Sequence, residues 1–203
     1  MLRIRTIALL FTSIAIAAGP ATKPTTPPAT RPGTLRFHFK GDASQWPADK
    51  REAIEKAMTE AAKYYNEVGG FDFDVPTVYS AGTPTADANY YSQIRFGGQI
   101  GTRTALHELG HVFGAGTHRN WQKLIKDGKW TGAAANAQLK EFDGPDAVLH
   151  ADRMHFWPYG LNFDSEGRTP DMYRKHVKMV AAFMKDLDAA GPTTRRARQR
   201  DRG

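Results

Sequence analysis

Two histidines and a glutamate stand together in the segment 107–111, which reads His-Glu-Leu-Gly-His. On an α-helix, residues four positions apart project from the same side, so His107 and His111 can both reach one ion at Zn–N distances of about 2.0–2.1 Å. Zinc lowers the pKa of a bound water from about 15.7 toward about 7, and Glu108 can take a proton from that water and pass it to a leaving nitrogen. The segment therefore predicts a zinc site with a general base, which is the chemistry of peptide-bond hydrolysis.

The chain around this segment resembles the metzincin clan of zinc metallopeptidases, whose pattern is His-Glu-x-x-His-x-x-Gly-x-x-His. The match runs through Gly114. Thr117 then stands where the clan has its third histidine, and His118 follows one position later. His118 is therefore one candidate for the third zinc ligand.

A closer likeness is to the leishmanolysin-like branch and its bacterial relatives, where Gly-Thr follows the helix and the third histidine comes much later, often beside a tryptophan. This chain has Gly-Thr at 116–117 and His-Phe-Trp at 155–157. The resemblance implies a zinc cofactor held by His107, His111 and His155, with His118 as the alternative third ligand and His150 as a less favoured one.

Metzincins also carry a methionine turn beneath the metal, and Met172 is the counterpart that the resemblance suggests, although its surroundings equally fit a helix start and a core methionine. Tyr159 has a hydroxyl that could donate to an oxyanion, but beside a proline and a glycine it reads equally as a turn residue, and we assign it no role. His38 and His176 are expected on the surface or on a helix face.

The elements that must position these residues follow from apolar periodicity. Alternating apolar residues predict strands at 35–39, 71–78 and, more weakly, 90–96. Apolar residues at helical spacing predict helices near 48–67 and 103–113, the second capped by Thr102 or Thr104. The fold class is therefore α/β (α+β), and the resemblance implies a zincin-like small twisted sheet packed on the active-site helix and a second long helix. Strand 90–96 is the expected edge, where an extended peptide could pair.

The second half of the sequence has fewer regular patterns. The segment 118–157 is expected to be irregular, apart from a short helix near 133–142. A helical apolar stripe follows Pro170. These elements complete one domain at 34–190.

The two ends of the chain have a different composition. Residues 1–18 combine two arginines with an apolar run too short to span a membrane, as in a secretory signal peptide. Residues 19–33 form a Pro/Thr-rich linker, and 191–203 an Arg-rich tail expected to be disordered. The two ends together carry a formal charge of +8 against +7 for the whole chain, so the predicted domain is close to neutral, which argues against a nucleic-acid partner. The protein is expected to be secreted, extracellular or periplasmic, without stable membrane insertion.

The sequence therefore predicts a secreted, monomeric zinc metalloendopeptidase that acts on protein or peptide substrates. One alternative is a catalytically inactive, zinc-stabilised binding or surface protein of the same fold, although a purely structural site would not need Glu108. Another is a metal-free carbohydrate- or surface-binding module that uses exposed aromatics such as Trp121, Trp130 and Trp157.

Overall fold

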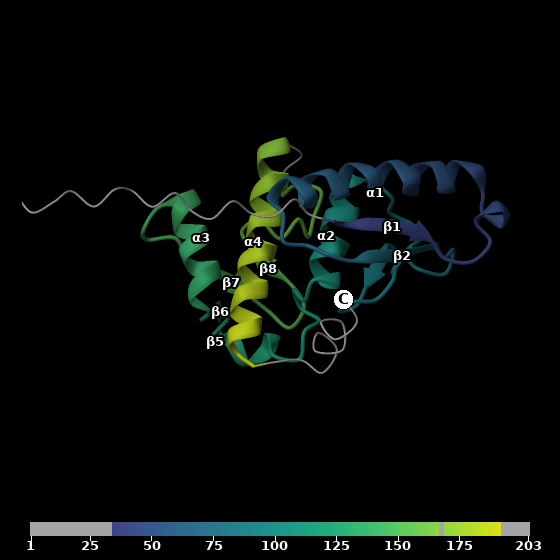
Figure 1. The fold of residues 1–203 in the computed structure, drawn as a ribbon. Helices are drawn as coiled ribbons and strands as arrows, with labels where there is room; N and C mark the ends of the chain where they lie inside the picture. The colour runs from purple at the N-terminus through teal and green to yellow at the C-terminus, as the bar shows by residue number, and fades with distance from the viewer. Residues whose placement is uncertain (1–33, 167–168, 192–203) are drawn as a thin grey trace, which may run out of the picture.

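The computed structural model describes residues 34–166 and 169–191. The predicted signal peptide, the linker and the tail from residue 192 onward lie outside the described residues. The described part has mixed α/β structure, with four α-helices and two small sheets. Figure 1 shows the long helix α1 (Ala48–Val68) on one side of the molecule and α4 (Pro170–Ala189) crossing its middle. The predicted class, α+β, agrees with this arrangement at the coarse level.

The first sheet has the strand order β1-β2-β4-β3. Its strands are β1 (Arg36–Phe39), β2 (Asp74–Tyr79), β3 (Ala86–Ala88) and β4 (Ile94–Phe96). β1 and β4 both run parallel to β2, with Phe37 opposite Val75 and Thr77 opposite Ile94, whereas β3 runs antiparallel to β4. A short 3₁₀ turn, η1 (Ala43–Gln45), leads from β1 into α1.

The prediction that segment 90–96 forms the edge of this sheet is wrong. Only Ile94–Phe96 is strand, and it lies between β2 and β3. The edge beside β4 is β3, at residues where the sequence predicted no strand. Three residues of sequence Ala-Asp-Ala carry little β propensity, so the strand depends on pairing with β4 rather than on its own composition.

Helices α1 and α2 (Thr102–Val112) pack together, and both contact the sheet. Apolar residues on one stripe of α1 are fully or almost fully buried, namely Ile54, Ala57, Met58, Ala61 and Tyr65. They pack with residues from the sheet and from α2 in one core. The predicted bounds of α2 were correct within a residue. Its predicted cap was not, because Gly101 occupies the N-cap position and no side chain caps the helix.

The segment expected to be irregular contains a second sheet, of antiparallel strands in the order β5-β6-β7-β8. Each strand has two residues: β5 (Ile125–Lys126), β6 (Lys129–Trp130), β7 (His150–Ala151) and β8 (Phe156–Trp157). The turn η2 (Trp121–Leu124) precedes them, and α3 (Ala133–Asp143) lies where a short helix was predicted. Strands this short leave no alternating pattern for the sequence to reveal.

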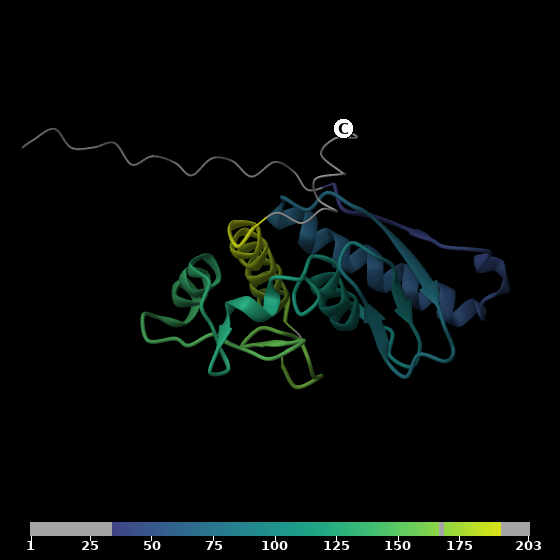
Figure 2. The same cartoon turned by 90° about the horizontal axis from the view of Figure 1, so that it is seen from below.

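Helix α4 joins the two halves. It contacts α1, α2 and α3, and Figure 2 shows it with α3 on one side and α1 and α2 on the other. The helix starts after Thr169, whose side chain accepts a hydrogen bond from the backbone N–H of Met172. Among the described residues, no helix has the length and apolar character needed to cross a membrane.

Candidate metal centre

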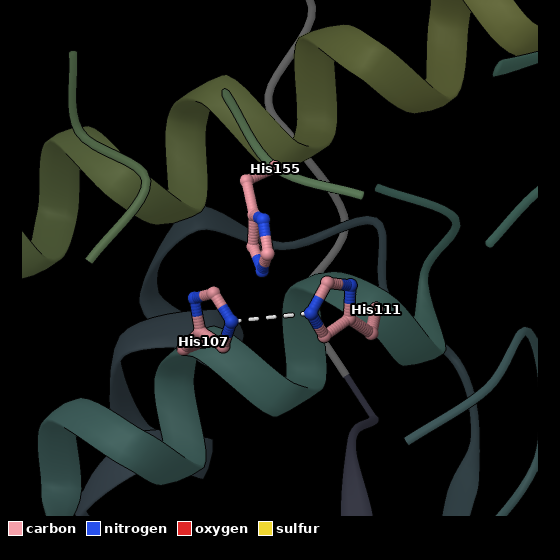
Figure 3. A group of neighbouring side chains, drawn as sticks. All are labelled: His107, His111 and His155. Atoms are coloured by element: carbon pink, nitrogen blue, oxygen red, sulfur yellow. Dashed lines mark hydrogen bonds between the residues drawn. The ribbon is translucent and has the colours of Figure 1, made fainter. Parts of the chain in front are cut away.

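Three histidine side chains converge on one point between α2 and the segment before β8. The ligand atoms that His107, His111 and His155 can offer all lie within 4.8 Å of one another. Nε2 of His107 lies 3.1 Å from Nε2 of His111. Figure 3 shows the ring of His155 extending from the neighbouring segment toward the gap between the other two rings.

The local geometry explains how residues so far apart in sequence meet. His107 and His111 lie one turn apart on α2, and their ring centroids are 4.7 Å apart. His155 immediately precedes β8, and its ring centroid lies 5.7 Å from that of His107 and 5.9 Å from that of His111. The second sheet therefore places the third histidine opposite the helix.

Backbone carbonyl groups contact the Nδ1 atoms of the two helix histidines, on the opposite side of each ring from Nε2. Nδ1 of His107 lies 2.9 Å from the carbonyl oxygen of Gly160, and Nδ1 of His111 lies 2.7 Å from that of Ala115. A neutral imidazole that donates from Nδ1 leaves the lone pair of Nε2 free. This is the outer-shell arrangement usual for a metal-binding histidine.

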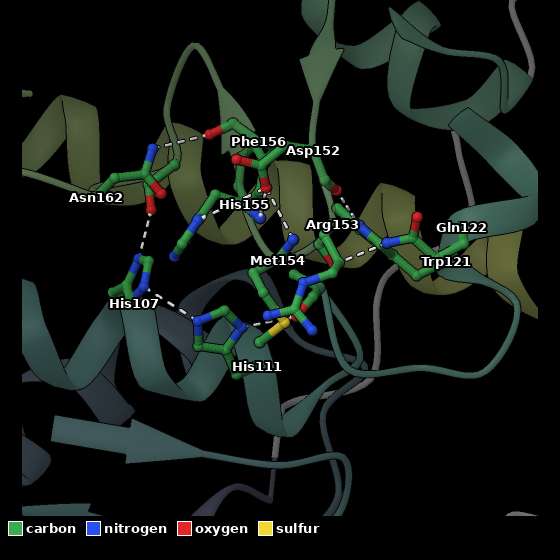
Figure 4. A network of polar contacts seen from close by, with 12 residues as sticks. His107, His111, Trp121, Gln122, Asp152, Arg153, Met154, His155, Phe156 and Asn162 are labelled. Carbon is green, nitrogen blue, oxygen red and sulfur yellow. Dashed lines mark hydrogen bonds and ion pairs between the residues drawn. The ribbon is translucent and has the colours of Figure 1, made fainter. Parts of the chain in front are cut away.

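A carboxylate orients the third histidine. Asp152 Oδ1 accepts hydrogen bonds from the backbone N–H groups of Met154 (2.8 Å) and His155 (2.6 Å) and lies 3.6 Å from Nδ1 of His155 (Figure 4). These contacts form a short turn that presents the His155 ring. The side chain of His155 stays partly exposed, so this side of the group is open.

The three side chains offer the nitrogen donors that zinc binds, and the two on α2 also have the spacing of zinc ligands. At Zn–N distances of about 2.0–2.1 Å, tetrahedral ligands lie about 3.3–3.4 Å apart, close to the separation of the two Nε2 atoms. Burial lowers the pKa of His107 well below its usual value, with the charge of His111 as the next cause, and burial also lowers the pKa of His111. Both side chains are therefore neutral near pH 7, the form that binds a metal. Three histidine ligands with one side open are typical of a catalytic site rather than a closed structural one.

Glu108 is buried beside this group and is only 4% exposed. Its Oε2 atom has no hydrogen-bond partner among the described residues. Burial, the largest cause, and the charge of Asp87 raise the pKa of its carboxyl group, the charge of Arg103 opposes them, and the resulting pKa is about 8. An unpartnered buried carboxyl is costly, and such groups concentrate at functional sites.

The three histidines and Glu108 line a cavity of about 300 Å³. Its walls include His107, Glu108, His111 and His155, together with the edge strand β3 on one side and Asn162 on another. Arg95 holds the carboxylate of Asp87, on β3, through two hydrogen bonds of 2.7 and 2.6 Å. The edge strand therefore borders the candidate centre.

The turn of residues 159–161 supports the centre from behind, and the sequence did not reveal it. Three successive carbonyl oxygens face side-chain nitrogens: that of Tyr159 faces His176 Nδ1 (2.7 Å), that of Gly160 faces His107 Nδ1 (2.9 Å), and that of Leu161 accepts from Arg103 (2.6 Å). His176, expected on the surface or a helix face, is only 1% exposed. Burial lowers its pKa to about 4.

The other candidate ligands lie elsewhere. His118 is buried with its ring against Tyr90, and its Nδ1 accepts from the backbone N–H of Asn120, so it is not part of the histidine group. His150 stacks on Trp157 and is also outside that group. His155 is thus the third member of the group that the described residues form.

The remaining sequence candidates also have structural explanations. Met172, in the first turn of α4, packs as a core methionine against a second buried cluster that includes Trp130, Phe156 and Phe183. The hydroxyl of Tyr159 donates to Asp143 at 2.6 Å, so it is engaged away from the histidines. Trp121 and Trp130 are buried, which removes two of the three tryptophans that a surface-binding module would expose.

Comparison of the chain with protein-family models, with curated proteins and with solved structures found no match. The function therefore has to be argued from the chain's own residues.

Proposed function

We propose that this protein is a zinc-dependent metalloendopeptidase. The proposal rests on one observation: Glu108, a buried carboxyl with an unpartnered oxygen, shares a cavity with three histidines whose ligand atoms lie within 4.8 Å of one another. A metal site that only stabilises a fold needs neither an adjacent carboxylate nor an open side. The metzincin-like zinc motif in the sequence supports the same activity.

The three histidines would hold zinc, which supplies Lewis-acid activation of a water molecule and of a carbonyl group. Glu108 acts as the general base. Its carboxyl, protonated near neutral pH in the metal-free protein, ionises when a positive charge lies at the histidine group, because a nearby cation favours the carboxylate. Glu108 then accepts a proton from water and returns it to the leaving nitrogen.

The substrate in this proposal is an extended segment of a protein or peptide. β3 pairs with β4 and borders the cavity, so its other side faces the site. Backbone groups at a sheet edge can pair with an added strand, and this mode of binding depends little on the side chains of the peptide. We infer that substrate lies along β3 rather than along segment 90–96, which β3 covers.

Cleavage of an unfolded protein mixture tests the activity. The parent and Glu108→Gln are compared at matched zinc content. Glu141→Gln is the control, because Glu141 is an exposed glutamate on α3 far along the chain from the motif. The parent and the control should cleave, and Glu108→Gln should bind zinc but lose most of its activity.

Two other results would count against the proposal. Zinc binding without cleavage in the parent would favour the zinc-stabilised binding protein, which needs the histidines but not the base. Equal cleavage by the parent and Glu108→Gln would remove Glu108 from the reaction and contradict the role given to it.

A further inference from the structure

His176 contacts every segment that carries a member of the histidine group. Its Nδ1 lies 2.7 Å from the carbonyl oxygen of Tyr159, in the turn that holds the His107 ring. Its Nε2 lies 3.0 Å from the carbonyl oxygen of Leu106 on α2. Its ring stacks on Phe156, the residue after His155, with ring centroids 5.8 Å apart and an angle of 17° between the ring planes.

The surroundings of His176 indicate which ring nitrogen donates. The neutral side chain has one N–H but faces two carbonyl oxygens. The carbonyl of Leu106 already accepts from the hydroxyl of Tyr65 at 3.1 Å, and the carbonyl of Tyr159 is the nearer of the two. Donation from Nδ1 to the carbonyl of Tyr159 therefore gives that acceptor a hydrogen bond, while the carbonyl of Leu106 keeps its bond from the hydroxyl of Tyr65.

The bond to Tyr159 matters because the next carbonyl in the chain orients His107. Tyr159 and Leu161 both have positive φ angles, 69° and 55°, which are unfavourable for residues with a side chain. Such a backbone conformation persists where the surroundings hold it. Here His176 holds one end of the turn and Arg103 the other, with the carbonyl of Gly160 between them.

We propose that His176 is a positioning residue of the candidate metal centre: by donating to Tyr159 from within the core, it fixes the turn of residues 159–161 so that Gly160 orients the ring of His107. His176 does not touch the metal or the substrate in this proposal. The inference rests on the metal-binding part of the proposed function and does not depend on peptide hydrolysis.

Three variants of the full chain separate the hydrogen bond from the packing. His176→Asn keeps an N–H near the position of Nδ1, His176→Gln moves the N–H toward the position of Nε2, and His176→Phe keeps a ring that can stack on Phe156 but has no donor. Ile54→Val is the control for lost core packing, because Ile54 is fully buried on α1 and is not part of the turn.

Zinc affinity is measured by competition with a chelator, and the visible spectrum of the cobalt(II)-loaded protein reports ligand geometry. His176→Phe and His176→Gln should lose about 10-fold or more in zinc affinity and show altered cobalt spectra, as usual for a lost outer-shell contact. His176→Asn and Ile54→Val should stay within about 3-fold of the parent. Because Asn and Gln carry the same functional group, their comparison still decides the matter if the Phe variant does not fold.

Parent-like affinity and spectra in a folded His176→Phe would overturn the inference, and so would an equal loss in Asn and Gln. Failure of the proposed function looks different. A parent that binds zinc without cleaving peptides would contradict the peptidase, while the affinities would still decide the role of His176. A parent that binds no metal would overturn both.

Discussion

The position that a Cβ atom would take on Gly116 lies 2.0 Å from the carbonyl oxygen of Met154. Gly116 follows helix α2, and Met154 immediately precedes His155. Absence of a side chain at residue 116 therefore lets the backbone before His155 lie against the loop after α2. The distance between the two backbone segments sets how far His155 stands from His107 and His111.

Gly116→Ala should lower zinc affinity by about 10-fold or more, because a Cβ atom must push Met154 and His155 away from α2. Gly128→Ala is a matched control: both glycines have a φ angle of 70°, but a Cβ on Gly128 meets nothing within 4 Å. Both variants carry the same backbone strain, and only the first moves His155. Calorimetric titration with zinc measures the difference; equal affinities would show that His155 does not depend on this contact.

His155→Ala should reduce zinc affinity by more than about 100-fold, since it removes a ligand, and loss of an outer-shell partner alone costs about 10–100-fold. His150→Ala, in the neighbouring strand β7, should bind zinc like the parent. Equilibrium dialysis followed by metal analysis compares the two. Retention of zinc by His155→Ala, with loss on replacing His118, would instead assign the third position to His118.

The sequence predicted the part of the site that depends on local spacing. The i, i+4 histidines with Glu108 between them require only that 102–112 be helical, and the apolar pattern of that segment indicates a helix. The prediction of His155 as the third histidine came from the order of motifs in the branch that the sequence resembles, not from geometry. His155 comes into reach only because β7 and β8 pair, and two-residue strands leave no readable pattern.

The residues that the sequence missed act through contacts between distant elements. His176 lies beside the apolar stripe of α4, and whether such a histidine faces water or a carbonyl depends on which segment packs there. Arg103 likewise looks like a surface residue in the sequence, but in the fold it donates hydrogen bonds to the carbonyl of Leu161 and to the carboxylate of Asp164. Strand β3 depends on β4 in the same way. Nothing in the local sequence of these residues specifies the partner.

Replacing Glu108 with the non-titrating glutamine should stabilise the metal-free protein at neutral and alkaline pH. Burial raises the pKa of this carboxyl from 4.5 to about 8, so the folded state holds a proton that the unfolded state releases above pH 4.5. The free energy of unfolding of the parent therefore falls as pH rises from about 4.5 to about 8. By pH 7 this fall amounts to about 3 kcal/mol. Glu108→Gln does not titrate and should lack this loss.

Urea unfolding of chelator-treated protein at pH 4.5 and pH 7.5 measures the effect. The stability advantage of Glu108→Gln over the parent should grow between the two pH values, whereas Glu141→Gln should follow the parent. An advantage that stays constant with pH would mean that Glu108 is already ionised in the folded metal-free protein.

His176 should make the metal-free protein sensitive to acid. Burial lowers its pKa from 6.5 to about 4, so the unfolded state binds a proton below pH 6.5 that the folded state does not accept until about pH 4. The stability that His176 contributes by staying neutral in the folded state is fully present above pH 6.5 and is lost as pH falls through about 4. Between pH 7.5 and pH 4.5 the loss amounts to about 2–3 kcal/mol.

His176→Phe cannot take up this proton, so its free energy of unfolding should fall less than that of the parent over the same pH range, even though the variant starts from a lower value at pH 7.5. Titrating groups distant from His176 are present in both proteins, and their contributions cancel in the comparison. Parallel stability curves for the two proteins would mean that His176 accepts its proton in the folded state as readily as in the unfolded one. Its two carbonyl contacts would then both be hydrogen bonds of a charged imidazolium.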